Sequence, residues 1–302
     1  KTKAEWLAKR QAAEDQFLKK KLRLWNGSYI SVIDAGIMAF ELALKLTGLR
    51  QRGLQNARDI QLKQITLGFD NLPAAFDGYR ILQLSDLHID TIPGLEQTIA
   101  AMVKDVPHDL CVWTGDYRMS TYGKYRQVIA PLQTIADASH APDGILGILG
   151  NHDPGALAAP LAQTGVQLLV NESIAIERDG ERIWFTGTDD PHYYFDPAQT
   201  SALKVSPEGF KVALVHSPEL YEQAAENNYR LYLCGHTHAG QICWPRGKPV
   251  FTNMRAPAAY AAGKWQYGRM TGYTSSGTGV SGIPARFYSR GEITLVTLKQ
   301  TA

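Results

Sequence analysis

The chain has 302 residues, of which 44% are hydrophobic and 20% are charged. This composition supports a sizeable buried core and excludes a chain that is disordered throughout. Lys and Arg number 31 against 29 for Asp and Glu, a formal net charge of +2, so the overall charge gives no argument for nucleic-acid binding.

The first 58 residues are predicted to be helical and differ in composition from the rest of the chain. Residues 1–25 hold eight basic and three acidic residues, a local excess of five positive charges (8 − 3). The apolar residues that share one face of this first helix are Trp6, Ala13, Phe17 and Leu24. After a break at residues 26–28, a second helix is expected, with a wide apolar arc formed by Ile30, Ile33, Ile37, Phe40 and Leu44.

Two interpretations of this helical pair stay open. Both helices pack on the globular body or on another subunit, or they lie in a membrane interface with Trp6, Phe17 and Trp25 toward the acyl region. A spanning helix over residues 29–49 is rejected, because three charged residues would each cost about 2.5–3.5 kcal/mol at the bilayer centre. These three residues are Asp34, Glu41 and Lys45. Because the chain begins with Lys1 rather than Met, we expect a processed or trimmed N-terminus, which leaves open a preceding signal or anchor.

From Ile60 onward, short apolar strands alternate with helices, which is typical of an α/β fold. Strands are expected at 60–65, 79–84, 110–114 and 144–149, and helices at 94–106, 124–138 and 155–164. The second half is richer in strands, expected at 166–170, 173–178, 182–187, 210–215, 230–234, 270–274 and 292–298. Polar clusters repeatedly follow the ends of these strands, where the loops of α/β sheets bind ligands.

Five polar clusters at strand ends carry the candidate chemistry. They are Asp86-Leu87-His88, Gly115-Asp116, Gly150-Asn151-His152-Asp153, Val215-His216 and Gly235-His236-Thr237-His238, and they contain five of the eight histidines. Taken singly, each cluster has a structural explanation, since a strand-end Asp commonly forms a turn or cap and a lone His is commonly a hydrogen-bonded group. Their joint occurrence instead favours a metal site. Carboxylate and imidazole ligands suit Mn, Fe or Zn, and seven candidate ligands suit two ions that share a carboxylate.

These clusters resemble the signature of the calcineurin-like metallophosphoesterases: D-x-H, G-D, G-N-H-D or G-N-H-E, H, and G-H-x-H. The resemblance covers roughly residues 60–298. It implies an α/β fold with a two-sheet β-sandwich core flanked by helices in four layers, preceded by an N-terminal helical appendage. On this basis residues 1–58 form the amphipathic segment and residues 59–302 the catalytic domain. The segments 83–88, 235–242 and 291–295 are similar to the bacterial membrane-associated branch, which includes UDP-diacylglucosamine pyrophosphatases of lipid A synthesis.

The resemblance also implies a role for each motif residue. One divalent ion would take Asp86, His88, Asp116 and His238, and the other would take Asp116, Asn151, His216 and His236, with Mn preferred and Fe or Zn as alternatives. Asp116 would bridge, with one carboxylate oxygen facing each ion, and a metal-bridging hydroxide would attack phosphorus in line. His152 would protonate the leaving oxygen or stabilise the charge on phosphorus. Asp153 would orient His152. The structural alternative is that Asp153, directly before Pro154, caps the following helix, and the two roles are compatible.

Departures from the family pattern bear on the substrate. Tyr117 and Arg118 follow Gly115-Asp116, where the family often carries Leu and an acid, Ala239 replaces a Gly, and Gly291 replaces a Pro. Arg118 either clamps a second phosphate or forms a surface salt bridge. The candidate substrate contacts are Arg118, Tyr125, Tyr193 and Tyr194, whereas His192 lies outside every motif and is not expected to be a ligand.

The leading hypothesis is a phosphoester hydrolase that acts on a lipid-linked or nucleotide-linked diphosphate or diester, such as UDP-diacylglucosamine. The alternatives are a phosphodiesterase or phosphatase for small soluble nucleotides and, in a different class, a non-catalytic scaffold. The scaffold is disfavoured because all seven ligands and His152 are present. The expected partners are a phosphate-containing small molecule or lipid and a membrane surface contacted by residues 1–58, with no nucleic-acid polymer. The expected location is the cytoplasmic face of the bacterial inner membrane, as a peripheral protein, or the cytoplasm.

Overall fold

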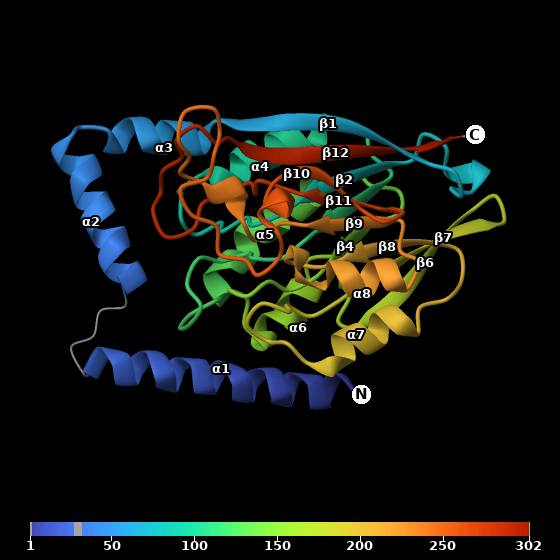
Figure 1. The fold of residues 1–302 in the computed structure, drawn as a ribbon, viewed down its shortest axis with the longest axis horizontal. Coiled ribbons are helices and arrows are strands. Elements are labelled where there is room, and N and C mark those ends of the chain that lie inside the picture. Colours follow the sequence, from blue (N-terminus) through green and yellow to red (C-terminus); the bar gives the residue numbers. More distant parts are fainter. Residues whose placement is uncertain (1, 27–31, 302) are drawn as a thin grey trace.

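Two six-stranded sheets form the centre of the computed structural model, which describes residues 2–26 and 32–301, with side chains described for 2–19 and 35–301 (Figure 1). The first sheet has the strand order β1 (Ile60–Phe69), β12 (Gly291–Gln300), β2 (Arg80–Leu84), β3 (Leu110–Trp113), β4 (Ile145–Gly147) and β5 (Val166–Leu168). The second sheet has the order β10 (Gly263–Tyr267), β11 (Met270–Thr274), β9 (Leu231–Cys234), β8 (Phe210–Leu214), β7 (Glu181–Gly187) and β6 (Glu172–Arg178).

Each sheet contains a block of parallel strands whose carboxyl ends carry the motif loops. Strands β2, β3, β4 and β5 are parallel, and so are β7, β8, β9 and β11. The strand pairs β12–β2, β6–β7 and β10–β11 are antiparallel. Because parallel strands end at the same edge, the loops after β2, β3, β4, β8 and β9 are brought toward one another.

The alternation of side chains along the buried strands builds the layers. In β2, Ile81 belongs to the core between the two sheets, whereas Leu82 belongs to the core on the outer face of the first sheet. That outer face is covered by α4 (Leu95–Lys104), α5 (Ile129–Ala138) and α6 (Ala158–Ala162). The second sheet packs its outer face against α7 (Pro197–Lys204) and α8 (Tyr221–Glu226). The arrangement of helices, sheet, sheet and helices confirms the predicted fold class.

Three elements in the second half of the chain were not predicted from the sequence: α7, α8 and β10. A local signal for α7 is present in the sequence, because Asp196 and Gln199 form a capping box around Pro197 at the first turn. The two short elements α8 and β10 lack such a signal. All three cysteines are buried as free thiols.

The N-terminal segment forms α1 (Lys3–Asn26), α2 (Val32–Leu46) and α3 (Arg50–Arg58). Figure 1 shows α1 running along the body below α6 and α7, and α2 beside the sheets at the end of the body where α3 begins. Trp6 Nε1 of α1 donates to Asp189 Oδ2 at 2.6 Å, and the Phe17 ring stacks on Tyr193 with centroids 5.1 Å apart. These two aromatic residues therefore contact the body instead of facing outward to lipid.

The second helix has an apolar face that contacts the body. Ile37, Phe40 and Leu44 pack against a small cluster that contains Ile283 and Ala285. Of the other residues assigned to helix faces, Ala13 is half-buried. The side chains of Leu24, Trp25, Ile30, Ile33 and Asp34 lie outside the described residues. Among the helices described, none combines the length and the apolar character needed to cross a bilayer.

Candidate metal centre

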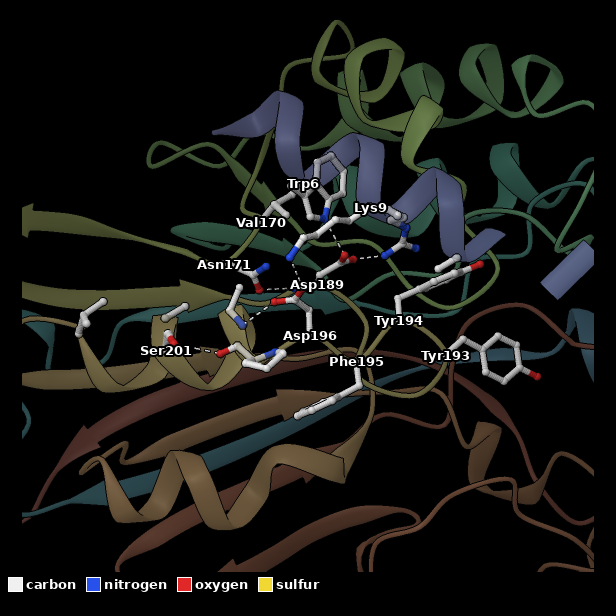
Figure 2. Close-up of a pocket in the computed structure, with 16 residues that line it drawn as sticks. Trp6, Lys9, Val170, Asn171, Asp189, Tyr193, Tyr194, Phe195, Asp196 and Ser201 are labelled. Atoms are coloured by element: carbon white, nitrogen blue, oxygen red, sulfur yellow. Dashed lines mark hydrogen bonds and ion pairs between the residues drawn. The ribbon is translucent and has the colours of Figure 1, made fainter. Parts of the chain in front are cut away.

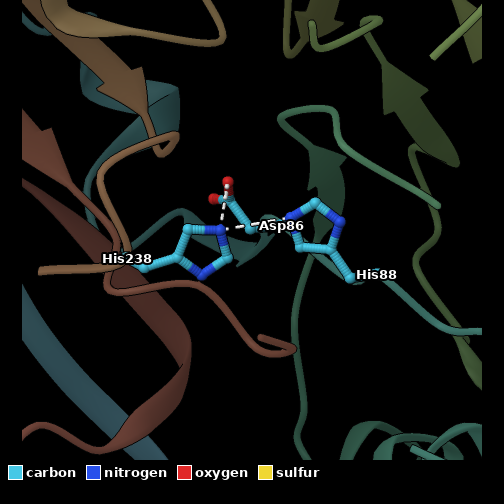
Figure 3. A group of neighbouring side chains, drawn as sticks. All are labelled: Asp86, His88 and His238. Atoms are coloured by element: carbon cyan, nitrogen blue, oxygen red, sulfur yellow. Dashed lines mark hydrogen bonds and ion pairs between the residues drawn. The ribbon is translucent and has the colours of Figure 1, made fainter. Parts of the chain in front are cut away.

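The strand-end loops bring the candidate ligands into two buried groups. The first group is Asp86, His88 and His238, and the second is Asp116, His216 and His236. In each group the ligand atoms lie within 4.8 Å of one another. Figure 3 shows the first group converging, with His238 Nε2 at 3.5 Å from Asp86 Oδ1 and 3.1 Å from His88 Nε2.

The backbone is strained at most of the seven candidate ligands. Five candidate ligands have positive φ angles: Asp86 (50°), His88 (36°), Asp116 (60°), His236 (72°) and His238 (51°). Such conformations cost on the order of 1–3 kcal/mol each for residues with a Cβ, and they cluster at functional sites. The glycines of the motifs allow neighbouring loops to pass close to one another. A Cβ on Gly150, for example, would collide with Asp116 Oδ1.

Backbone carbonyls set the tautomers of three histidines. His88 Nδ1 lies 2.7 Å from the Arg118 carbonyl, and His216 Nδ1 lies 2.8 Å from the Thr114 carbonyl. His236 uses its other nitrogen, with Nε2 at 2.6 Å from the Asn253 carbonyl. Because a carbonyl only accepts, each of these nitrogens donates, and the remaining ring nitrogen turns toward the site as a ligand atom.

The inner atoms fit a pair of cations. His236 Nδ1 lies 2.9 Å from Asn151 Oδ1, although both atoms are acceptors in the tautomer that Asn253 sets. Two lone pairs at this distance repel each other unless a positive charge lies beside them. The donors are imidazole nitrogens and oxygens without sulfur, a set that suits Mn, Fe or Zn.

One oxygen of Asp116 lies between the two groups. Asp116 Oδ2 is 3.6 Å from His88 Nε2 and 3.3 Å from His216 Nε2. The other oxygen, Oδ1, accepts the backbone N–H of His152 at 2.8 Å. The family resemblance implies one oxygen for each ion, and the geometry differs: Oδ1 is hydrogen-bonded to the backbone, so Oδ2 alone faces both groups.

The electrostatics of the site favour neutral imidazoles at His88, His236 and His238 and a positive charge beside His216. Burial lowers the pKa of His88 to about 3, and it lowers the pKa values of His236 and His238 well below their ordinary value. Burial also acts against a charged His216, but the Asp116 carboxylate outweighs it and raises the pKa of His216 well above the ordinary value. The field that favours a proton there also favours a metal ion.

His152 lies beside the two groups rather than in either of them. Its Nδ1 donates to the Met119 carbonyl, and its Nε2 is 4.0 Å from Asp116 Oδ2. The side chain is 17% exposed, in contrast to the fully enclosed His88. The ring therefore presents Nε2 at the accessible side of the centre, oriented by Met119.

Asp153 has a different role from the two that the sequence suggests. Its carboxylate accepts backbone N–H groups of Asp116 at 2.8 Å, Tyr117 at 2.9 Å and Gly150 at 2.8 Å. The short helical turn after Pro154 has no side-chain cap. Asp153 thus joins the loops after β3 and β4, while Met119 takes the orienting role toward His152.

The four candidate substrate contacts occupy different places. The buried Arg118 donates to the carbonyls of His152, Gly123 and Lys124 at 2.9, 3.0 and 3.0 Å, so its guanidinium is neither a phosphate clamp nor part of a surface salt bridge. Tyr125 packs against the outer core of the first sheet, and Tyr194 lies beneath the Arg10 guanidinium. Of the four, only Tyr193 lines the cavity beside the metal groups.

That cavity has a volume of about 580 Å³ and was not anticipated from the motifs. One wall is polar and includes Asp116, Asn151 and His152. The other wall is apolar and is formed by Ile37, Phe40, Ile242, Val250, Phe251 and Ile283. The apolar arc of the second helix was the sequence signal for Ile37 and Phe40, but only the structure brings that helix to the candidate ligands.

His192 supports the second group from outside. Its Nδ1 lies 2.6 Å from Glu219 Oε1, and its Nε2 accepts from Asn253 Nδ2 at 3.1 Å. Asn253 in turn accepts from His236 through its backbone carbonyl. His192 belongs to neither metal group, as the absence of a motif around it predicts. Asn253 was missed because nothing in its local sequence marks it.

Comparisons with known proteins agree with these motifs. The model of the calcineurin-like phosphoesterase family matches residues 79–240. The uncharacterized metallophosphoesterase YkuE of Bacillus subtilis is 30% identical over 255 residues, which cover 80% of this chain and 86% of that protein. The phosphodiesterase YaeI of Escherichia coli is 27% identical, over 73% of this chain and 82% of that protein. A transmembrane protein with a metallophosphoesterase domain from Danio rerio is 29% identical, over 86% of this chain and 62% of that protein.

Proposed function

The chain belongs to the calcineurin-like phosphoesterase family, and from this premise we propose that it hydrolyses phosphodiester or diphosphate bonds with two divalent metal ions held beside Asp116. The observation that carries the proposal is the position of Asp116 Oδ2 between two buried ligand groups. When bound, two such ions activate water for attack on phosphorus and neutralise the charge of the transition state.

The proposed ligands divide by group. Asp86, His88 and His238 hold one ion, and Asn151, His216 and His236 hold the other, with Asp116 shared by both. We propose Mn²⁺ as the preferred ion, with Fe or Zn as the alternatives, because oxygen and imidazole donors without thiolates suit these borderline metals.

His152 is the proposed proton donor. The Met119 carbonyl holds the proton on Nδ1, so Nε2 is the atom that faces the accessible side of the site. A proton on Nε2 would pass to the leaving oxygen as the bond to phosphorus breaks. Asp153 acts on the backbone of the loops, and it keeps Asp116 and Gly150 at a fixed separation.

The apolar wall of the cavity supports a substrate with an acyl group. Phosphate at the metal groups would leave the rest of the substrate against Phe40, Phe251 and their apolar neighbours. Burying each CH₂ group contributes about 0.8 kcal/mol, so a lipid-linked diphosphate such as UDP-diacylglucosamine suits this wall. A soluble nucleotide is the second candidate, since the rings of Tyr193 and Phe251, which both line the cavity, offer stacking surfaces for a base.

Helix α2 also supports a peripheral contact with a membrane surface. Met38, Leu42 and Leu46 lie on its outward face and are 60%, 56% and 80% exposed. They follow one another at helical spacing, while Ile37 and Phe40 face the cavity. Since the described aromatic residues of α1 contact the body, we assign the lipid contact proposed for residues 1–58 to α2.

Substrate comparison tests the proposal. We expect the purified protein to hydrolyse bis(p-nitrophenyl) phosphate, and a chelator to abolish this activity. The kcat/KM for UDP-diacylglucosamine should exceed that for UDP-N-acetylglucosamine by about 100-fold or more, since each 1.4 kcal/mol of acyl burial is a factor of ten. Equal values for the two would favour the soluble-nucleotide candidate. Full hydrolysis in excess chelator would contradict the metal mechanism itself.

A further inference from the structure

Arg10 on helix α1 is buried against the loop that carries Asn151 and His152. Arginines on surface helices are usually exposed, but Arg10 is only 2% exposed. It lies outside residues 79–240 that the family model matches. Its burial therefore calls for an explanation that the family motifs do not supply.

The guanidinium holds both ends of the 150–153 loop. Nη2 donates to the Gly150 carbonyl at 2.8 Å and to the Asp153 carbonyl at 2.6 Å. These two carbonyls flank Asn151 and His152 in the chain. Because Nη2 bonds to both ends, it fixes their separation together with the 3.3 Å hydrogen bond from the Asp153 N–H to the Gly150 carbonyl. The positions of Asn151 Oδ1 and His152 Nε2 depend on this backbone.

The same guanidinium reaches the second sheet. Nη1 forms an ion pair with Asp189 Oδ1, and Asp189 follows β7. The Tyr194 ring lies beneath the guanidinium, with 4.0 Å between Cζ and the ring centroid. Figure 2 shows Asp189 pointing up to α1, where Trp6 Nε1 donates to its other oxygen at 2.6 Å. Arg10 thus connects a loop of the first sheet with a loop of the second.

A second contact from α1 bears on the same loop. Glu14 Oε1 accepts the backbone N–H of Gly155 at 2.7 Å. A Cβ on Gly155 would lie 2.9 Å from Leu7 Cδ1 and 3.5 Å from Arg10 Cγ, so the side chains of α1 pack directly against the backbone here. The residues following the 150–153 loop are therefore also held by α1.

We propose that Arg10 is a positioning residue, through which α1 holds Asn151 and His152 in the geometry that phosphoester hydrolysis requires. The proposal rests on the proposed function, in which Asn151 binds metal and His152 donates a proton. A displacement of about 1 Å in such groups can cost about 100-fold in rate. The competing explanation is that Arg10 only anchors α1 to the body. It predicts that the Arg10 variants lose stability while the rate of the folded enzyme stays the same.

The test uses Arg10→Ala, Arg10→Lys and the matched control Lys9→Ala in the full chain. Lys9 is on the same helix and forms an exposed ion pair with Asp196 at 3.1 Å. The readouts are kcat and KM on bis(p-nitrophenyl) phosphate with metal in excess, thermal midpoint, and bound metal per folded protein. We expect Arg10→Ala to lower kcat by about 100-fold with a change of less than about threefold in KM, and added millimolar guanidinium to restore part of kcat.

The controls separate the explanations. Lys9→Ala should keep kcat within about twofold, because exposed ion pairs contribute little. Arg10→Lys should fold and show an intermediate kcat, since a single ammonium cannot reproduce the planar fork. If Arg10→Ala fails to fold, Arg10→Lys alone tests the effect on kcat. An unchanged kcat in folded Arg10→Lys and Arg10→Ala would overturn the proposal. So would a loss of kcat that is proportional to the loss of folded protein and that added guanidinium does not restore. An inactive wild-type chain would instead overturn the proposed function.

Discussion

The Asp153 carboxylate accepts the backbone N–H of Asp116 at 2.8 Å, which ties the loop after β4 to the residue between the two metal groups. The same carboxylate accepts from Tyr117 and Gly150. Three backbone donors on one buried acid make this side chain the link between two adjacent parallel strands of the first sheet. The site is therefore held by backbone hydrogen bonds as well as by its ligands.

Replacing Asp153 by Asn should destabilise the protein and weaken metal binding together. The amide has only one acceptor oxygen, and its NH₂ group would face a backbone donor. Buried N–H groups would therefore lose their acceptor, and each unsatisfied group costs about 1–3 kcal/mol. Urea unfolding should show a midpoint shift at unchanged slope, and metal titration should show weaker binding. Wild-type stability together with wild-type metal affinity would contradict this role.

Replacing His216 by Ala should remove one of two bound ions. His216 Nε2 is within 3.3 Å of Asp116 Oδ2 and 3.0 Å of Asn151 Oδ1, so its loss opens the second group. We expect phosphodiester hydrolysis to fall by about 1,000-fold or more, comparable to removal of other essential catalytic groups. Elemental analysis should give about one ion per chain instead of two. His108→Ala is the control, because His108 bonds to Val106 and Ser139 away from the site.

Chelation should abolish activity and lower thermal stability, and Mn²⁺ should restore both. A ligand that binds only the folded state at 100 times its Kd stabilises by about 2.7 kcal/mol. The thermal midpoint should therefore rise with Mn²⁺ concentration in the wild type and rise less in His216→Ala. A midpoint that is independent of Mn²⁺, Fe²⁺ and Zn²⁺ would argue against a metal site at these residues.

Replacing His152 by Gln should lower kcat while leaving bound metal unchanged. General acid catalysis contributes about 10²–10⁴-fold, and His152 lies outside both ligand groups. The loss should be larger for a substrate with an alkoxide leaving group than for p-nitrophenolate, which departs without a proton. An equal loss on both substrates would indicate that His152 stabilises charge on phosphorus instead.

Replacing Ala239 by Gly should stabilise the protein. Ala239 has a φ of 51° and a ψ of 30°, and this left-handed conformation costs about 1–2 kcal/mol for a residue with a Cβ. After the entropy cost of glycine, a gain of about 0.5–1 kcal/mol remains. Ala43→Gly is the matched control in the helical α2, where the same substitution should destabilise by about 1 kcal/mol. Equal shifts in the two thermal midpoints would contradict the strain at Ala239.

The alternation of strands and helices and the five strand-end clusters could be predicted from the sequence, whereas the two-sheet, four-layer arrangement was implied by the family resemblance of those clusters. Apolar strands separated by helices have a local signature, and the carboxyl ends of parallel strands meet at one edge whatever the details of the loops. The motif residues therefore identify candidate ligands without a structure. Ala239 likewise stands out in the sequence, although its strain is visible only in the backbone angles.

The roles of the remaining polar groups were decided by tertiary structure. Arg118 resembles a phosphate clamp in the sequence, yet it bonds to three carbonyls. Arg10 lies in a basic segment that suits a membrane surface, yet it bonds to residues 140 and 143 positions away. Hydrophobic periodicity records which face of an element is buried, but it carries no information on which distant backbone oxygen a side chain will meet. That pairing depends on how the loops and α1 pack together, and packing exists only in the folded chain.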